Sequence, residues 1–183
     1  MKISAFVGSP NRDGNTATLV KAMCEAASRN GHETRIFHLY DLKIAGCRDC
    51  GHCKTESEDC ILPDDFQMCR KEIIASEGII LASPVYFGQI TGTLKSFIDR
   101  WCCFFSPAFA IRQLQGKKFA TVTASGAPTE QFRNVSEYLN YWMGEFFKMK
   151  LVGNVIGGSL VKHTLAGTRQ DLLDEAARIG SLF

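Results

Sequence analysis

Four closely spaced cysteines are the first feature of this sequence that could do chemistry. Cys47, Cys50, Cys53 and Cys60 are separated by two, two and six residues. Thiolates at such spacing can surround one [4Fe-4S] cluster, and cysteine thiolates are the ligands that these clusters use. Structural zinc fits less well, because zinc sites usually divide their ligands into two separated pairs. A cluster, zinc, and a set of reduced or vestigial thiols therefore all stay open as interpretations.

A polar turn from Gly8 to Thr16 is the second such feature. It follows an apolar run that predicts a buried strand, and it precedes a helical pattern that Asn15 or Thr16 is expected to cap. Unpaired N–H groups and the helix dipole favour an anion there. The turn lacks both the dinucleotide fingerprint and the Walker motif, so it predicts a site for one terminal phosphate. The expected binding residues are Ser9, Pro10, Arg12, Gly14, Asn15, Thr16 and Ala17.

Two later turns follow apolar strands and are expected at the same edge of the sheet. The earlier of the two, which is the second turn of the site, offers an apolar and aromatic wall for a flat ring, and its expected residues are Pro84, Val85, Tyr86, Phe87 and Gly88. The third turn offers backbone N–H groups for the polar edge of that ring, and its expected residues are Thr123, Ser125 and Gly126. Phosphate, ring face and ring edge together predict FMN, whose reduced form the N–H groups around Ser125 and Gly126 would stabilise.

Alternating strands and helices must position these turns. The expected strands are Lys2–Val7, Glu33–Leu39, Gly78–Ala82, Lys118–Ala124 and Leu151–Gly157. The expected helices run to about Arg29, from Asp64 to about Ser76, from Thr91 or Thr93 to about Phe104, from Thr129 to Phe147, and from Gly167 to Phe183. This pattern predicts an α/β fold, a doubly wound five-stranded parallel sheet with helices on both faces. The turns favour the flavodoxin-like order 2-1-3-4-5.

Length and composition restrict the number of domains, the classes of partner and the location that can be expected. Residues 1–183 are expected to form a single domain, in which a cysteine-bearing insertion loop occupies about 40–63. The net charge of +2 with scattered Lys and Arg argues against a nucleic-acid partner. The sequence shows no membrane-spanning run and no signal-peptide pattern, so a cytoplasmic location is expected. The other cysteines, Cys24, Cys69, Cys102 and Cys103, are expected to be buried in helices. His163 is expected to be solvent-exposed.

Several short motifs resemble those of a known family. They are Gly8-Ser9-Pro10, Gly14-Asn15-Thr16, Ser83-Pro84-Val85-Tyr86, Gly92-Thr93-Leu94-Lys95, Phe97-Ile98-Asp99-Arg100, and the cysteine loop followed by Asp64-Asp65. Together they resemble the flavodoxin-fold NAD(P)H-dependent FMN reductases, and more narrowly the iron-sulfur flavoproteins.

That resemblance implies an FMN-dependent oxidoreductase in which a [4Fe-4S] cluster on the four loop cysteines passes single electrons to FMN. It also implies a homodimer or homotetramer. The electron donor is left open between NAD(P)H and ferredoxin, and the acceptor is expected to be a small molecule. A reductase without a cluster is the first alternative, and a flavin-binding redox sensor or interaction module is an alternative of another class.

Overall fold

The computed structural model describes all residues 1–183 and contains a five-stranded parallel sheet in the order β2-β1-β3-β4-β5. The predicted strand order and the parallel pairing are confirmed. The strands are β1 (Lys2–Val7), β2 (Glu33–His38), β3 (Gly78–Pro84), β4 (Lys118–Ala124) and β5 (Lys150–Gly157).

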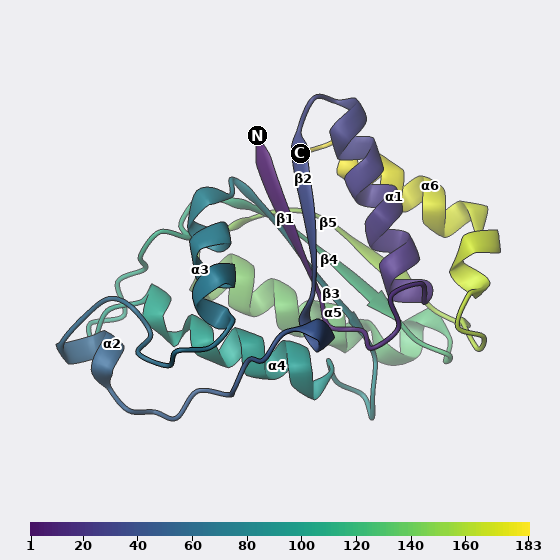
Figure 1. Ribbon diagram of the computed structural model, residues 1–183. Coiled ribbons are helices and arrows are strands. Elements are labelled where there is room, and N and C mark those ends of the chain that lie inside the picture. The colour runs from purple at the N-terminus through teal and green to yellow at the C-terminus, as the bar shows by residue number, and fades with distance from the viewer.

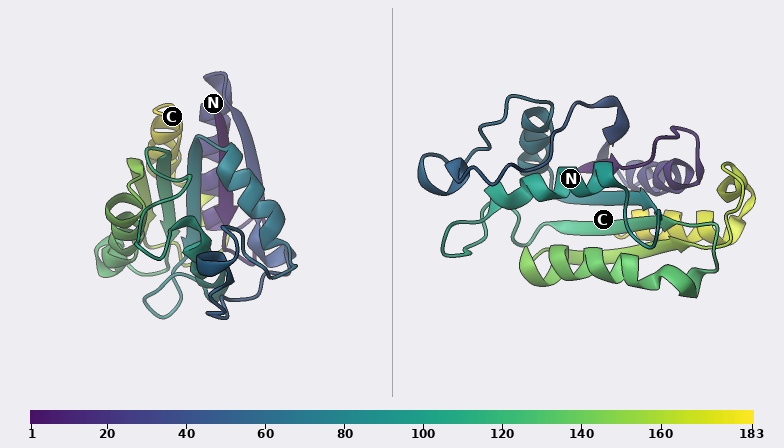
Figure 2. Two further views of the ribbon diagram at one scale, coloured as in Figure 1. Left: turned by 90° about the vertical axis from the view of Figure 1, so that its left-hand side faces the viewer. Right: turned by 90° about the horizontal axis from the view of Figure 1, so that it is seen from below.

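Helices cover both faces of the sheet, as predicted (Figure 1). One face carries α1 (Asn15–Arg29) and α6 (Gln170–Gly180), and the other carries α3 (Phe66–Ala75), α4 (Gly92–Asp99) and α5 (Arg133–Asn140). The short α2 (His52–Thr55) belongs to the cysteine loop, residues 40–63, which projects beyond α3 and α4 (Figure 2). A short 3-10 helix, Leu39–Asp41, lies at the start of this loop.

Each face of the sheet has its own hydrophobic core, because parallel strands covered on both sides bury nearly every side chain. β1 and β3 are almost entirely buried. Aromatic side chains fill the core under α3, α4 and α5. There the Phe6 ring lies 5.2 Å from that of Phe37 and 4.8 Å from that of Phe97. Aliphatic side chains, many of them alanine, fill the other core. There α6 approaches α1 closely enough that a Cβ on Gly180 would meet the Met23 carbonyl oxygen at 2.1 Å.

Three helices differ from the prediction by more than two residues. The segment expected as one helix from Thr129 to Phe147 consists of a 3-10 turn (Thr129–Phe132), α5 and a π-helical turn (Tyr141–Phe146). Gly144 lowers the helical preference of that last part, and the wider turn still buries Met143. Past Asp99, the chain after α4 continues as a 3-10 helix, Arg100–Phe104. The last helix begins at Gln170 instead of Gly167.

The carboxyl ends of β1, β3 and β4 lie side by side, and main-chain hydrogen bonds continue past the strands into the turns. The N–H of Gly8 donates to the carbonyl of Ala82 at 2.7 Å, and the N–H of Val85 donates to that of Ala124 at 2.8 Å. The sheet itself therefore fixes where the first two turns begin.

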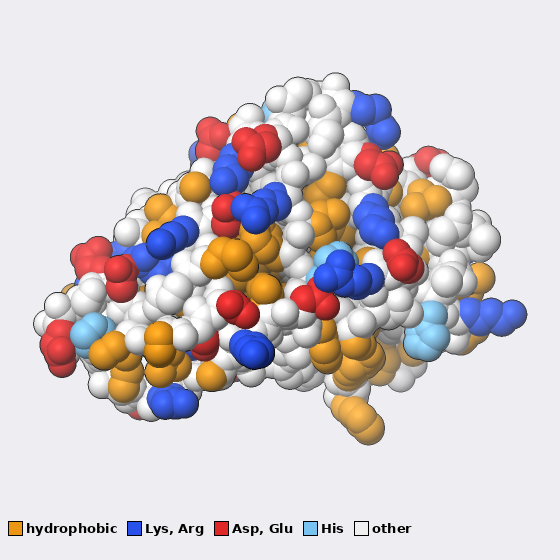
Figure 3. All heavy atoms as spheres, in the orientation of Figure 1, with side chains coloured by type: hydrophobic (Ala, Val, Ile, Leu, Met, Phe, Trp, Pro, Cys, Tyr) orange, Lys and Arg blue, Asp and Glu red, His pale blue; other side chains and the backbone are white.

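The face of the molecule drawn in Figure 3 has no dominant charge. Figure 3 shows positive and negative side chains interspersed over the visible face, with small hydrophobic groups between them. None of the helices combines the length and the apolar composition that crossing a bilayer requires.

Candidate functional site

A cavity of about 250 Å³ lies at the carboxyl edge of the sheet, and all three predicted turns line it. We call it the sheet-edge cavity. A fourth segment, late in the chain, closes one side. The lining residues are Ser9, Pro10, Asn11, Gly14, Asn15, Thr16, Pro84, Val85, Tyr86, Ala124, Ser125, Gly126, Leu160, Val161 and His163. No carboxylate is among them, so no negative side chain opposes an anion in this cavity.

Five residues of the predicted site do not line the cavity. Arg12 is exposed and forms an ion pair with Asp41. Ala17 and Thr123 are buried, and the hydroxyl of Thr123 has no hydrogen-bond partner. Phe87 is fully exposed at a φ of 50°, and Gly88 follows it at a φ of 76°, so these two form the tip of the second turn.

The first turn keeps several donors free. The hydroxyl of Ser9 is engaged locally, because it accepts from the N–H of Asn11 at 3.2 Å. Gly14 occupies the N-cap position of α1 and supplies no side-chain cap, so the expected caps Asn15 and Thr16 are one and two residues too late. The N–H groups of Asn15, Thr16 and Ala17 donate to no protein acceptor. Such free groups at a helix start favour an anion.

The Asn15 side chain makes three hydrogen bonds to a late segment of the chain, which the sequence did not predict. Its side-chain amide donates to the carbonyls of Lys162 at 2.7 Å and Leu160 at 3.3 Å. Its side-chain oxygen accepts from the N–H of Ala166 at 2.8 Å. The Asn15 side chain is therefore fully used in tying the late segment to the first turn, and it has no donor left for a ligand. This contact brings Val161 and the exposed His163 to the cavity.

Of the donors expected in the third turn, those of Ser125 are used within the protein and that of Gly126 is free. The N–H of Ser125 donates to the carbonyl of Gly157 at 2.8 Å, which continues the sheet, and the hydroxyl of Ser125 donates to the carbonyl of Ala127 at 3.0 Å. The N–H of Gly126 has no protein acceptor. Of the two residues, only Gly126 keeps a free backbone donor.

A second, smaller cavity of about 50 Å³ lies in the cysteine loop, and we call it the cysteine cavity. All four predicted metal ligands line it: Cys47, Cys50, Cys53 and Cys60. Cys47 and Cys50 are exposed, whereas Cys53 and Cys60 are partly buried. The thiols share the cavity without converging, because no three Cys, His, Asp or Glu side chains lie close enough together to hold a metal ion.

Cys102 is a fifth thiol at this cavity, which corrects the expectation that it is a buried helical residue. Burial raises its pKa, and the neighbouring Cys53 and Cys47 act in the same direction while Lys54 opposes them. The other three helical cysteines are buried as expected. Burial raises the pKa of Cys24, Cys69 and Cys103 to about 12 in each case, which leaves these thiols protonated and unreactive at neutral pH.

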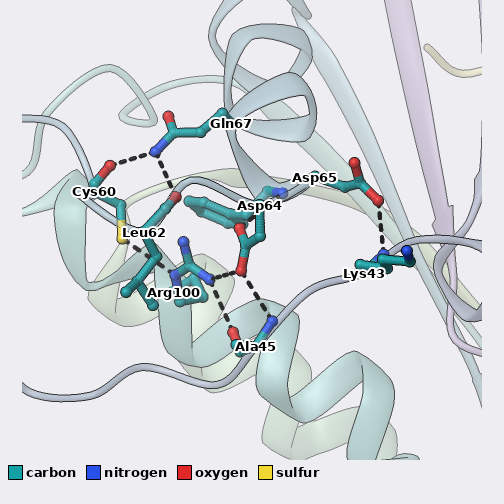
Figure 4. A network of polar contacts seen from close by, with 9 residues as sticks. Lys43, Ala45, Cys60, Leu62, Asp64, Asp65, Gln67 and Arg100 are labelled. Carbon is teal, nitrogen blue, oxygen red and sulfur yellow. Dashed lines mark hydrogen bonds and ion pairs between the residues drawn. The ribbon is translucent and has the colours of Figure 1, made fainter.

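Arg100 forms the centre of a polar network beside the cysteine cavity (Figure 4). Its Nε donates to Cys60 Sγ at 3.2 Å, and one Nη donates to the Ala45 carbonyl at 2.9 Å and to Asp64 Oδ2 at 2.6 Å. Burial lowers the pKa of Arg100, but the hydrogen bonds to Asp64 and Cys60 outweigh it and raise the pKa above its usual value. Arg100 is therefore a permanent buried cation.

Comparison with known proteins identifies the family. The sequence profile of the NADPH-dependent FMN reductase family matches residues 1–159. This chain belongs to that family. Its fold agrees: the NAD(P)H:quinone oxidoreductase from Methanothermobacter marburgensis superposes with a TM-score of 0.74 at 18% identity, over 99% of this chain and 96% of that one.

Two curated relatives of this chain have names that mention different cofactors. An iron-sulfur flavoprotein of Archaeoglobus fulgidus is 34% identical over 126 residues, which cover 69% of this chain and 60% of that protein. YwqN of Bacillus subtilis, described as an NAD(P)H-dependent FMN-containing oxidoreductase, is 27% identical over 98% of this chain and 100% of its own length. The chain spans about half to three-fifths of the length of the first iron-sulfur flavoproteins that it matches.

The sheet-edge cavity fits the FMN of this reductase family. Free N–H groups at the start of α1 suit a terminal phosphate, and Pro84, Val85 and Tyr86 form an apolar wall that suits a flat ring. The chemistry of the wall and the absence of carboxylates agree with an anionic, partly aromatic ligand.

The cysteine cavity has a net positive lining, which suits a thiolate cluster. Arg48, Lys54 and Arg100 line it beside one carboxylate, Asp49. Arg112, which pairs with Glu58, donates to the Cys53 carbonyl at 3.2 Å. The Lys54 ammonium bonds the Cys102 and Phe105 carbonyls. In addition, one buried Nη of Arg100 has no hydrogen-bond partner. Four thiolates around iron carry net negative charge, so these cations and the free donor fit the group.

Proposed function

We propose that this chain is an FMN-dependent oxidoreductase that binds FMN in the sheet-edge cavity and takes electrons from NAD(P)H. The observation that carries the proposal is the meeting of three separate turns at one cavity, in a chain of the FMN reductase family. When bound, FMN supplies the redox chemistry because it accepts one or two electrons. A small-molecule acceptor would then be reduced.

The protein's own residues bind and orient the cofactor. The N–H groups of Asn15 and Thr16 and the hydroxyl of Thr16 would hold the phosphate. Pro84, Val85 and Tyr86 would lie against the ring, and the N–H of Gly126 would donate to the polar edge where negative charge develops on reduction. Arg12 and the Asn15 side chain do not take part as phosphate donors, since both are engaged elsewhere.

Replacement of the Thr16 hydroxyl tests this assignment. Thr16→Val keeps the shape but removes one donor to a charged phosphate, which is worth about 1.5–3 kcal/mol, so FMN affinity should fall at least about tenfold. Thr18→Val is the matched control, because the Thr18 hydroxyl donates to the Gly14 carbonyl at 3.0 Å and does not line the cavity. Flavin titration of both variants measures the effect, and an equal affinity in Thr16→Val and wild type would contradict the assignment.

We further propose that the cysteine cavity holds a [4Fe-4S] cluster on Cys47, Cys50, Cys53 and Cys60. The spacing of the cysteines, their shared cavity and the surrounding cations support this, as does the name of the Archaeoglobus relative. A reductase without a cluster is the second candidate. It is favoured by the arrangement of the loop, in which no three potential ligand side chains lie close enough together to hold a metal ion.

Anaerobic purification followed by assays of iron, sulfide, zinc and flavin, with a visible spectrum, separates these candidates. About four irons per chain would support the cluster, zinc alone would assign a structural site, and flavin without metal would assign the cluster-free reductase. Reduction of the flavin by NADH, NADPH and reduced ferredoxin, followed by stopped flow, identifies the donor. If every donor fails, the sensor or interaction-module function gains support over the enzyme.

We also propose that copies of this chain assemble as a homodimer or homotetramer, as the family resemblance implies. A groove of about 370 Å³ between α4 and the π-helical turn supports this, because exposed aromatic side chains line it, among them Phe109 and Trp142. Sedimentation equilibrium on the protein measures the mass of the assembly directly, and the mass of a single chain would contradict the proposal.

A further inference from the structure

We propose that Arg100 is a positioning residue for the cysteine cavity: it holds Cys60 in place and supplies N–H donors that stabilise negative charge on a bound cluster. The inference rests on the proposed cluster and goes beyond it, because it gives a role to a residue outside the cysteine motif.

The contacts of Arg100 join parts of the chain that are distant in sequence. From the end of α4 its guanidinium reaches the Ala45 carbonyl, Cys60 Sγ and the Asp64 carboxylate, which are 55, 40 and 36 residues away. Ala45 precedes the four cysteines and Asp64 follows them. One side chain therefore fixes both ends of the cysteine segment to the same helix end (Figure 4).

The orientation of the guanidinium is held from several sides. It is 1% exposed and lies 4.6 Å from the centre of the Phe66 ring. Asp64 is fixed in turn, because its Oδ2 also accepts from the N–H of Ala45 at 3.0 Å and its Oδ1 accepts from the N–H of Phe66 at 3.2 Å. With the guanidinium plane fixed in this way, Nε–H points at Cys60 Sγ. A lysine has no planar fork and could not make these contacts together.

One donor of Arg100 is unused. The second Nη is buried and has no protein partner, in a residue that lines the cysteine cavity. Leaving a buried N–H without an acceptor is unfavourable, so native proteins seldom do it without a reason. Sulfur atoms of a bound cluster would supply the missing acceptor.

The chemical consequence concerns the reduction potential. Adding one electron to a cluster makes it more negative by one charge, with no bond broken. Hydrogen bonds to the sulfurs are among the factors that set cluster potentials, and a buried cation favours the more negative state. Arg100 should therefore raise the midpoint potential, while the neighbouring carboxylate of Asp64 should lower it.

The test compares Arg100→Gln, Arg100→Lys and Asp64→Asn with wild-type protein purified anaerobically. Midpoint potential is measured by dithionite titration followed by visible and EPR spectra, and iron retention by the rate of loss to a chelator. Arg100→Gln should lower the potential and lose iron roughly tenfold faster, as outer-shell substitutions at metal sites do. Arg100→Lys should fall between Arg100→Gln and wild type. Asp64→Asn should shift the potential in the opposite direction, because it removes a negative charge and leaves the bond to Cys60.

Arg70→Gln is the matched control. Arg70 is also buried and pairs with Asp59 of the cysteine loop, but it bonds none of the four predicted ligands, so its loss should lower the potential much less than the loss of Arg100. Equal potentials in wild type and Arg100→Gln, at full iron content, would overturn the inference and leave the cluster proposal standing. A downward shift in both Arg100→Lys and Asp64→Asn would assign Arg100 a purely structural role, and this pair decides the question if Arg100→Gln does not fold. Wild-type protein that takes up no iron would overturn both proposals.

Discussion

The sheet-edge cavity and the cysteine cavity are built by different means. At the sheet edge, the main chain of β1, β3 and β4 continues into the turns, as the bonds from Gly8 to Ala82 and from Val85 to Ala124 show. The cysteine loop has no such ladder and is held by side chains, chiefly Arg100, Asp64 and Gln67. The first cavity should therefore respond most to changes that move the backbone, and the second to loss of single side chains.

Helix α4 links the two regions. Thr91 caps its start, and the hydroxyl of Thr91 donates to the Gly8 carbonyl of the first turn at 2.7 Å. Arg100 follows its end at the cysteine cavity. A helix of this length separates the two residues by about 13 Å along its axis. The same rigid element thus positions both cavities, which lets substitutions at its two ends be compared directly.

The largest effect is expected from Gly8→Ala, which acts on the backbone. A Cβ at this position would lie 2.6 Å from Leu94 Cβ and 2.9 Å from Thr91 Oγ1, so the turn must move away from α4. Overpacking of this kind costs about 1–3 kcal/mol, and FMN affinity should fall by more than about tenfold. Urea unfolding and flavin titration measure the two effects.

Gly92→Ala is the control for that variant. No atom lies within 4 Å of a Cβ at Gly92, in the first turn of the same helix. Since alanine is the better helix former, stability should be unchanged or slightly higher and FMN affinity should stay the same. Similar losses in the two alanine variants would contradict the view that backbone placement builds the sheet-edge cavity.

A smaller effect is expected from Asn15→Ala, which tests the one part of the sheet-edge cavity held by a side chain. The variant loses the bonds to the Leu160 and Lys162 carbonyls and to the Ala166 N–H, so the late segment should loosen while the sheet stays intact. FMN affinity should fall by about tenfold or less, with a loss of stability of about 1 kcal/mol.

Asn30→Ala is the matched control for the loss of such a contact, because Asn30 also bonds a distant carbonyl, that of Ser181 at 3.1 Å, far from the cavity. It should lose some stability and no flavin affinity. If Asn15→Ala binds FMN as wild type does, the late segment plays no part in binding.

The difference between the two cavities also decides how much could be predicted from the sequence. Buried parallel strands are continuous apolar runs, and their turns follow at once, so strand order and three walls of the sheet-edge cavity could be predicted. The roles of Asn15, Arg100 and Cys102 could not. Each depends on contacts between residues far apart in the chain, such as the 151 residues between Asn15 and Ala166, and local patterns carry no signal for these. The predicted helix boundaries around Arg100 and Tyr141 were wrong for a related reason, because tertiary packing overrides local helical preference there.

The smallest effect is a pH dependence confined to the cysteine loop. Burial raises the pKa of Asp64, but hydrogen bonds from Arg100 and from the Ala45 N–H outweigh it and hold the pKa below its usual value. The unfolded segment therefore takes up its proton at a higher pH than the folded one. The stabilisation from this carboxylate is complete above about pH 5 and is lost progressively as the pH falls further.

Hydrogen exchange, corrected for intrinsic rates, can follow this loss at single amides. The N–H of Ala45 donates to Asp64 Oδ2 and should lose protection on acidification, whereas the N–H of Ser125 donates to the main chain of Gly157 and should keep it. Asp64→Asn should remove the pH dependence of exchange at Ala45, because the asparagine side chain takes up no proton in this pH range. Loss of protection at Ser125 to the same extent would mean that acid opens the whole fold, and the contrast between a cavity built by the main chain and one built by side chains would not hold.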